Sequence, residues 1–375
     1  WFLVSAVYFA DARARVLEES LINKLSIIIE ASGILDCVEQ GGIVAIKLHV
    51  GERWHYRHVR PQFVRVIVDK IKECGGKPFI TDSCTLYSGF RHNAVDHFET
   101  AILNGFSYAT VGAPFIPADG IRGRYGVRVK IDGKIIRDVE IAGVFSEVDF
   151  VVVLSHVKGH GLAGFGGALK NIAMGCVTRK EKARLHMHGK PKVLYEYCIG
   201  CGTCAKICPV GAISVAGKAN IDAEKCLGCG ECVVSCPRGA IRFDPADSIE
   251  FQVKMADAVL GFIKLVGENN IAYINFVLDV TPYCDCFAAP DIPVVPDVGI
   301  LASRDPVAID QASIDLINKA RPIVNPDIPP DVSDVFKSMH NIDWTILLTT
   351  AEELGIGKRE YVLRTIHVGK EQTRY

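Results

Sequence analysis

The sequence has no apolar run that reaches the roughly 18 to 20 residues needed to cross a bilayer, so we expect no membrane span. It also has no excess of charge of one sign, because 42 basic and 43 acidic residues leave a formal net charge of −1. These charges are interspersed, whereas nucleic-acid binding needs a concentrated basic face. Residues 1–7 read as a first strand, without the basic region or cleavage site of a secretory signal, and there is no twin-arginine signal. We therefore expect a cytoplasmic protein without a nucleic-acid partner.

The sequence is rich in apolar residues and in cysteine. About half of its 375 residues are apolar (49%), which is ample for a sizeable core and for two or three domains. A chain of this size does not need disulfides for stability. Eight of the 14 cysteines fall within residues 198–236 at ligand-like spacing, which indicates a reducing compartment and favours an anaerobic host.

Strand and helix signals alternate along the first third of the chain. Short apolar runs predict strands at 4–9, 43–50 and 77–82, and helical spacing predicts helices at 12–34, 61–74 and 93–104. This alternation predicts an α/β fold with a mostly parallel sheet and helices on both faces.

The later segments indicate that this α/β domain is interrupted. Residues 127–131 and 135–141 alternate in period two around Asp132-Gly133, which predicts a hairpin at the rim of the sheet within 121–144. The α/β pattern resumes at 150–154 and again after the cysteine-rich segment. We expect an α/β domain formed by residues 1–190 and 247–375, with a small α+β, ferredoxin-like insert at 191–246.

The cysteines of the insert form an internal repeat. Residues 198–209 read CIGCGTCAKICP, and residues 226–237 repeat the pattern as CLGCGECVVSCP. This is the run of two-cluster bacterial ferredoxins, in which the fourth cysteine of each run binds the other cluster. The resemblance implies two [4Fe–4S] clusters. One would be held by Cys198, Cys201, Cys204 and Cys236, and the other by Cys226, Cys229, Cys232 and Cys208.

The spacing within each run has a physical reason. Two-residue gaps let three thiolates converge from one tight loop, and the intervening glycines let backbone N–H groups approach the cluster. Soft thiolate ligands suit iron–sulfur chemistry. The alternative is a pair of zinc sites with four cysteines each, but zinc ribbons usually lack the third, closely spaced cysteine.

A glycine-rich segment, residues 154–171, follows a predicted buried strand and opens a helix. Glycines there permit tight turns and would leave N–H groups at the helix N-terminus free to bind an anion. Lys158 and Lys170 would supply positive charge, and His156 and His160 an acid, a base or a metal ligand. The alternative is a loop whose glycines serve packing alone.

Other candidate site residues also end predicted strands, where open α/β sheets bind ligands. They are Lys47, His49 and Asp82, each of which taken singly could be solvated or a helix cap. Cys284 and Cys286, together with Cys176, could hold an additional metal or cluster, although buried inert thiols are an equal alternative. The pair His186 and His188 lies in a basic segment, and we expect it to be solvated.

Several segments together resemble one family. They include Gly51-Glu52-Arg53, Arg60-Pro61, Thr81-Asp82, Thr85-Leu86-Tyr87, Arg91, 93–97, 158–176, 284–286 and 299–310. They are similar to the domain-of-unknown-function 362 family, iron–sulfur centre proteins of anaerobic bacteria and archaea. The resemblance covers nearly the whole chain and implies an α/β fold with a ferredoxin insert, without an established reaction. The glycine-rich segment is also faintly similar to one in lactate racemase-type proteins, which bind a nickel pincer cofactor but lack the insert.

These observations predict an iron–sulfur oxidoreductase component. Electrons from a redox partner protein would enter through the two clusters and reach a small anionic ligand, with lysines stabilising negative charge and a histidine moving the proton. The predicted catalytic residues are Lys47, His49, Asp82, His156, Lys158, His160 and Lys170. The first alternative is an electron-transfer subunit that docks a larger redox enzyme and has no active site of its own. A metal-dependent isomerase with a regulatory cluster pair is the second.

Overall fold

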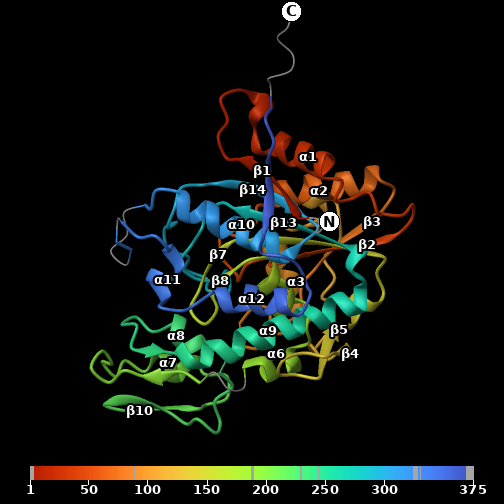
Figure 1. Ribbon diagram of the computed structural model, residues 1–375. Helices are drawn as coiled ribbons and strands as arrows, with labels where there is room; N and C mark the ends of the chain where they lie inside the picture. Colours follow the sequence, from red (N-terminus) through yellow and green to blue (C-terminus); the bar gives the residue numbers. More distant parts are fainter. Residues whose placement is uncertain are drawn as a thin grey trace, which may run out of the picture.

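A seven-stranded sheet forms the centre of the computed structural model (Figure 1). The structure describes residues 4–87, 89–186, 190–228, 230–243, 245–323, 328–329 and 331–368. In spatial order the strands are β15 (Tyr361–Thr365), β1 (Ser5–Asp11), β14 (Gly299–Ser303), β13 (Ile271–Val277), β6 (Phe150–His156), β2 (Ile43–Leu48) and β3 (Lys77–Thr81). Only β14 runs against the others, because both of its pairings are antiparallel and the remaining four are parallel. The predicted mostly parallel sheet is confirmed.

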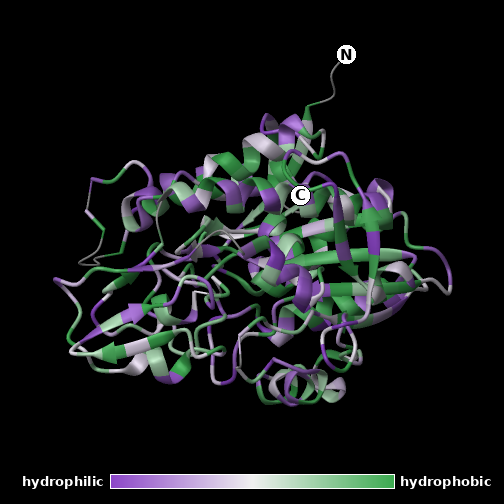
Figure 2. Ribbon diagram, turned by 90° about the horizontal axis from the view of Figure 1, so that it is seen from below, coloured by the Kyte–Doolittle hydropathy of each residue, from purple (hydrophilic) through white to green (hydrophobic). Residues whose placement is uncertain are grey.

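Both faces of the sheet are covered, which explains why strands β6 and β13 are buried along their whole length. Side chains alternate between two cores: Val151 and Val153 point into one, Val152 and Leu154 into the other. Figure 2 shows several strands coloured mostly in the hydrophobic part of the scale. A strand buried on both faces reads as an unbroken apolar run, so the sequence predicted these strands well.

Helices form the two outer layers. Helices α1 (Leu21–Ser32) and α2 (Pro61–Glu73) cover one face, and the other face carries α5 (Ala168–Gly175), α9 (Pro245–Val266), α10 (Pro306–Lys319) and α12 (Thr345–Glu353) (Figure 1). Further helices outside the cysteine-rich segment are α3 (Ala94–Leu103), α4 (Tyr108–Val111), α6 (Arg179–His186) and α11 (Val335–His340), with 3₁₀ turns at Leu17–Glu19, Gly143–Ser146 and Glu268–Asn270. The predicted α/β class with helices on both faces is confirmed.

Helix α1 begins nine residues later than the periodicity predicts, at Leu21 instead of Ala12. Ser20 stops it from extending further back, because the Ser20 side chain accepts a hydrogen bond from the N–H of Asn23 as a helix cap does. Residues before the cap form only the short 3₁₀ turn. A local side-chain bond therefore overrides the apolar spacing that suggested a longer helix.

The predicted hairpin forms as a separate two-stranded sheet, β4 (Gly126–Lys130) and β5 (Asp138–Ala142). Its second strand starts later than residue 135, where the alternation predicted it. The reason is Asp257 of α9, whose carboxylate accepts hydrogen bonds from the N–H groups of Lys134, Ile135 and Ile136 at 2.6, 2.8 and 2.9 Å. These amides bond to the helix and so cannot join the strand ladder.

The cysteine-rich segment folds into a small α+β unit at the lower edge of Figure 1. Strand β9 (Lys192–Val193) pairs with β12 (Ile241–Arg242), and β10 (Ile213–Ala216) pairs with β11 (Lys218–Ile221). Short helices α7 (Thr203–Ile207) and α8 (Glu231–Val234) follow the cysteine loops. The unit has a hydrophobic cluster of its own, which supports the inference that residues 191–246 are an insert.

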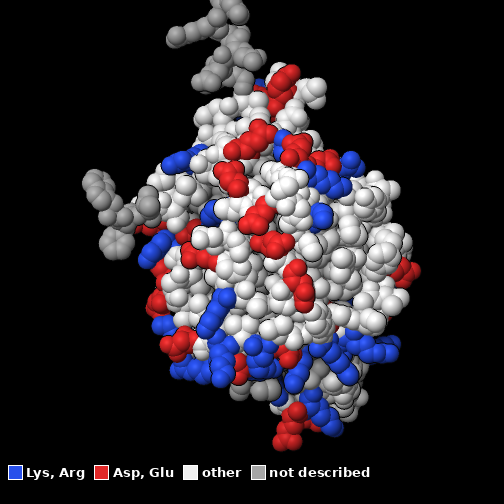
Figure 3. Space-filling model, turned by 90° about the vertical axis from the view of Figure 1, so that its right-hand side faces the viewer, with Lys and Arg blue, Asp and Glu red and all other residues white. Residues whose placement is uncertain are grey.

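No helix among the described residues is long and apolar enough to cross a membrane. On the face shown in Figure 3, basic and acidic side chains lie side by side, with Lys and Arg denser towards the lower part. This mixture agrees with the near-zero net charge of the chain.

Candidate functional site

A cavity of about 160 Å³ lies where the predicted strand ends meet. Strands β13, β6, β2 and β3 are parallel neighbours, so their carboxyl ends lie at one edge of the sheet. The structure brings six of the seven predicted catalytic residues into the lining of this cavity: Lys47, His49, Asp82, Lys158, His160 and Lys170. These residues converge because the strands that carry them are neighbours in the sheet. The sequence alone did not establish that strand order.

His156 is the exception, because it lies beneath the cavity and does not line it. Its Nδ1 is 2.8 Å from Asp285 Oδ1, and its Nε2 is 2.9 Å from the carbonyl oxygen of Leu278. Both ring nitrogens are therefore engaged with oxygen acceptors, and neither is available to a ligand. His156 therefore does not join the other predicted residues in the cavity lining, and it contacts Asp285 of the Cys284–Cys286 loop instead.

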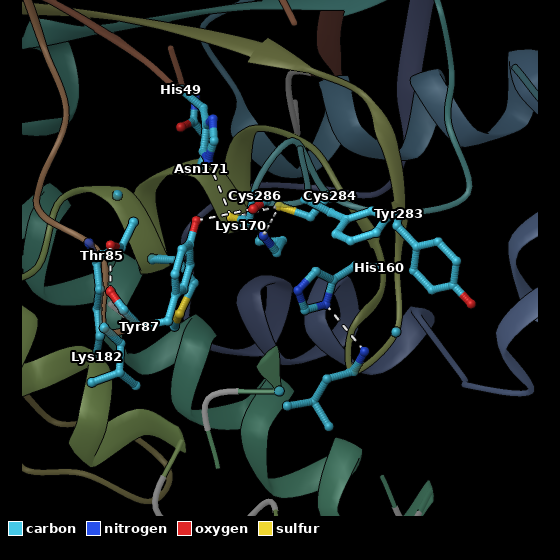
Figure 4. A pocket seen from close by; sticks show the side chains of 18 of the residues that line it. His49, Thr85, Tyr87, His160, Lys170, Asn171, Lys182, Tyr283, Cys284 and Cys286 are labelled. Atoms are coloured by element: carbon cyan, nitrogen blue, oxygen red, sulfur yellow. Dashed lines mark hydrogen bonds between the residues drawn. The ribbon is translucent and has the colours of Figure 1, made fainter. Parts of the chain in front are cut away.

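Asp285 is the centre of that loop. Besides His156, it forms an ion pair with Lys158 at 3.2 Å. Burial alone would raise the Asp285 pKa, but the charges of His156 and Lys158 outweigh burial and hold it well below its ordinary value. Because Asp285 is anchored below, the side chains of Cys284 and Cys286 on either side of it face the cavity (Figure 4).

The two thiols lie close together, with their Sγ atoms 3.2 Å apart. Lys170 Nζ is 3.6 Å from Cys284 Sγ, and His49 Nε2 is 3.3 Å from Cys286 Sγ (Figure 4). The ligand atoms of His49, Cys284 and Cys286 are all within 4.8 Å of one another, so they form a possible metal-binding group. However, His49 Nδ1 accepts the N–H of Gly51 at 3.0 Å, which puts the ring proton on Nε2 and makes His49 a hydrogen-bond donor to Cys286.

Cys176 does not join this group, so the predicted trio of Cys176, Cys284 and Cys286 is not assembled. Cys176 ends helix α5 and is fully buried in the hydrophobic core. Burial raises the pKa of its thiol far above the ordinary value, which is the behaviour of an inert core cysteine.

The helix N-terminus predicted to bind an anion is already occupied. The first two amides of α5, those of Ala168 and Leu169, donate to the carboxylate of Asp310 at 2.7 and 3.0 Å. Gly167 permits this approach, because a Cβ there would lie 2.3 Å from Asp310 Oδ1. The residues between strand β6 and helix α5 form a short hairpin, β7 (Lys158–His160) and β8 (Gly164–Gly166). Gly167 therefore serves close packing, and any anion must bind elsewhere in the cavity.

The lysines of the cavity differ in how their charge is used. Lys47 is fully buried, with Asp82 at 3.2 Å, and Lys158 pairs with Asp285. Burial alone would raise the Asp82 pKa, but Lys47 and other nearby cations leave it lowered. Lys170, in contrast, has no carboxylate within 4.0 Å among the described residues, and Cys284 is its hydrogen-bond partner. Lys182 also lines the cavity, and its Nζ bonds backbone carbonyls rather than a carboxylate. Among the described residues, Lys170 and Lys182 are therefore the cavity lysines without a carboxylate partner, and Lys170 is the one that faces a thiol.

His160 has a defined tautomer. Its Nδ1 accepts the N–H groups of Leu162 and Ala163 at 3.3 and 3.0 Å, so the proton lies on Nε2 (Figure 4). Burial and the charge of Lys170 lower its pKa well below 6.5. A neutral His160 thus offers one N–H donor.

Several cavity residues were not predicted from the sequence. Tyr87 donates to Glu52 at 2.9 Å, and buried Arg91 lies beside both. His186 was expected to be solvated, but it lines the cavity, as Lys182 does, and it packs on Phe251 with ring centroids 4.6 Å apart. His188 lies outside the described residues. For Glu52, Tyr87 and Arg91, the family resemblance of the segments that contain them was the only signal in the sequence.

The cysteines of the insert line two smaller cavities. One is lined by Cys198, Cys201, Cys204 and Cys236, and the other by Cys208, Cys226 and Cys232. The structure thus brings the side chains together in the two sets that the repeat predicts, and Cys229 lies outside the described residues. The described cysteines are all free, so none of these thiols is used in a disulfide.

Backbone N–H groups point at several of these sulfur atoms. Ala219, Ala212, Gly228 and Ala240 donate to Cys198, Cys208, Cys226 and Cys236 at 3.4, 3.2, 3.4 and 3.3 Å, respectively. Hydrogen bonds of this kind stabilise negative charge on sulfur and tune iron–sulfur clusters. The donor set and its surroundings therefore fit cluster ligation.

The second cysteine cavity adjoins the cavity of the α/β domain. Gly230 and Glu231, at the start of α8, line both of them. Burial, together with the charge of Glu52, raises the pKa of Glu231 to about 7, although Arg91 opposes the shift. One short segment of chain therefore separates the two cavities.

These features define an α/β protein whose cysteine-rich segment contributes Gly230 and Glu231 to the cavity at the strand ends. Residues 44–315 match the family described as a domain of unknown function, DUF362. The match covers well over half of the chain, so the chain belongs to this family. The resemblance noted in the sequence is confirmed at the level of the family.

The chain is also similar to solved structures. One is the lactate racemase apoprotein from Thermoanaerobacterium thermosaccharolyticum, at 14% identity and a TM-score of 0.36, covering 73% of this chain and 51% of that one. Another is a Thermotoga maritima protein, at 10% identity and a TM-score of 0.39, covering 76% and 55%. The chain spans about half the length of these two structures. No curated protein matches it.

Proposed function

We propose that this chain is an iron–sulfur protein that passes electrons through two [4Fe–4S] clusters to the cavity of its α/β domain, as an oxidoreductase component acting on a small anionic ligand. One observation carries the proposal: the second cysteine cavity shares Gly230 and Glu231 with a cavity that contains buried lysines. A redox partner protein would supply the electrons.

The cysteine sets fit the clusters in number, element and grouping. Each predicted set has four thiols, and seven of the eight lie in the described residues as two separate groups. When bound, such clusters carry single electrons at potentials set partly by hydrogen bonds to sulfur. The four backbone N–H groups described above are placed to make such bonds.

The residues of the cavity would bind and orient the ligand. Lys170 would offset its negative charge, and the Nε2–H of His160 would donate a hydrogen bond to it. The ion pairs of Lys47 with Asp82 and of Lys158 with Asp285 hold the walls in place. A subunit that only docks a larger enzyme would not need a cavity of this kind, which favours the enzyme over the first alternative.

The proposal can be tested by anaerobic purification followed by iron, sulfide and zinc analysis. We expect about eight irons and about eight sulfides per chain, with an electron paramagnetic resonance signal after reduction. About two zinc ions and no sulfide would instead show that the cysteine sets are zinc sites and would overturn the proposal.

A further inference from the structure

We infer that Cys284 and Cys286 are a redox-active pair, which cycles between a disulfide and a dithiol as the clusters deliver electrons. The inference rests on the proposed function for the source of the electrons. It adds a group in the cavity that can store two of them.

The geometry of the pair carries the inference. The Sγ atoms are 3.2 Å apart, so an approach of roughly 1 Å would form a bond of the usual length of about 2.05 Å. Both residues line the cavity, and Asp285 between them is held from below by His156 and Lys158. The loop thus presents both sulfurs on one side.

The surroundings suit a pair that changes its charge. Lys170 Nζ faces Cys284, and the Nε2–H of His49 faces Cys286. In the reduced state, one proton would lie between the two sulfur atoms, and the pair would carry one negative charge. Hydrogen bonds from Lys170 and His49 would stabilise that charge. A structural pair of core thiols would not need a cation at one sulfur and a fixed N–H at the other.

The pair would also solve a problem of electron count. Each cluster releases one electron, whereas breaking the S–S bond consumes two electrons and, here, one proton. The two clusters, each oxidised by one electron, therefore balance one disulfide reduced to one thiol and one thiolate. The reverse step would pass both electrons and the proton to a two-electron acceptor in the cavity.

The test uses the complete protein, purified without oxygen. It is oxidised with an excess of oxidised glutathione, desalted, denatured and alkylated with N-ethylmaleimide, and the mass of the peptide containing residues 284–286 is measured. We expect the wild type to lose two alkylation sites at this peptide, and the same result in Cys74→Ser, whose exposed thiol lies outside the cavity. Two alkylated thiols under all conditions, or zinc held by this pair, would overturn the inference.

The source of the electrons is tested with reduced methyl viologen. In the wild type we expect it to restore both thiols at least about tenfold faster than in Cys232→Ala, which removes a ligand of the second cluster. Dithiothreitol, which needs no cluster, should reduce the disulfide of both proteins at the same rate and show that Cys232→Ala has a native cavity. Equal rates with viologen would overturn the link to the clusters.

The two proposals fail in different ways. A disulfide that forms in a chain without iron would overturn the proposed function and keep the redox-active pair. A full iron content together with thiols that never form a disulfide would keep the proposed function and overturn the redox-active pair. The wild-type peptide mass decides on the pair even if Cys232→Ala does not fold.

Discussion

The insert and the α/β cavity are built in opposite ways. In the insert, one residue type at short spacing lines two small cavities, and each cavity takes most of its thiols from one run and a single thiol from the other. The α/β cavity gathers lysines, histidines, carboxylates and thiols from loops more than two hundred residues apart, such as His49 and Cys286. The first arrangement depends on local spacing and the second on strand order and buried hydrogen bonds. The two regions should therefore respond differently to substitution.

The largest effect is expected in the insert. Cys204→Ala and Cys232→Ala each remove one ligand of a different set, and each should cost about four of the eight irons. The measurement is iron content together with the reduced resonance spectrum of each variant. If either variant kept all its iron or lost all of it, the division of the cysteines into two independent sets would be wrong.

In the α/β domain the largest loss of stability should follow Asp310→Ala. The substitution leaves the buried amides of Ala168 and Leu169 unpaired. It also removes one of the two acceptors of the Asn275 side chain, which donates to Asp310 at 2.8 Å and to Ser313 at 3.0 Å. We expect a loss of about 2 to 4 kcal/mol in the free energy of unfolding, measured by denaturant titration. The control is the exposed Asp291→Ala, which should change stability by less than about 0.5 kcal/mol.

Asp310 also predicts a dependence on pH. Burial raises its pKa from 3.8 to about 6, although Asn275 and the two amides oppose the shift. The folded chain therefore holds a proton that the unfolded chain releases, so the stability that Asp310 contributes is full below its unfolded pKa and declines as the pH rises towards 6. Between pH 5 and 6 the difference in unfolding free energy between wild type and Asp310→Ala should narrow by about 1 kcal/mol, because folded Asp310 is half ionised at its pKa. If this difference in unfolding free energy grew between pH 5 and 6, the pKa of Asp310 would not be raised in the folded protein.

A smaller loss is expected for Asp257→Ala. Without its carboxylate, three N–H groups in the turn of the hairpin lose their acceptor. We expect about 1 to 3 kcal/mol in unfolding free energy, with faster hydrogen exchange at residues 134–136. Unchanged exchange there would show that the turn is held by other contacts.

The smallest of these effects concerns the charge of Lys170. Lys170→Gln should weaken the binding of inorganic phosphate, used as a probe anion, by about tenfold, which is about 1.4 kcal/mol. Titration calorimetry gives the affinity, and Lys180→Gln on the exposed side of α6 is the matched control. Equal affinities of the two variants would remove Lys170 from the anion site.

This contrast also explains how far the sequence alone could lead. The cysteine sets follow from a repeat within a single segment, and buried strands follow from unbroken apolar runs. The positions of Lys47, Asp82 and Lys158 near one another follow from the rule that parallel strands place their carboxyl ends at one edge.

Other features depend on contacts between distant segments. Asp310 reaches the start of α5 from 142 residues away, and no local pattern shows that the amides there are already paired. His156 lies at a strand end like its neighbours, but Asp285 and a backbone carbonyl occupy it. Glu231 becomes part of the cavity only because the insert docks against the strand ends.

The central claim is that the second cluster, and not the first, adjoins the α/β cavity. It is tested most directly by measuring cluster reduction potentials at pH 8.5 with and without Glu231→Gln, in Cys204→Ala and in Cys232→Ala, which retain the second and the first cluster, respectively. Above its pKa of about 7, Glu231 is ionised, and a nearby negative charge disfavours the reduced cluster. We expect Glu231→Gln to raise the potential in the Cys204→Ala background and to leave it unchanged in the Cys232→Ala background. Equal shifts in both backgrounds, or none in the first, would contradict the account.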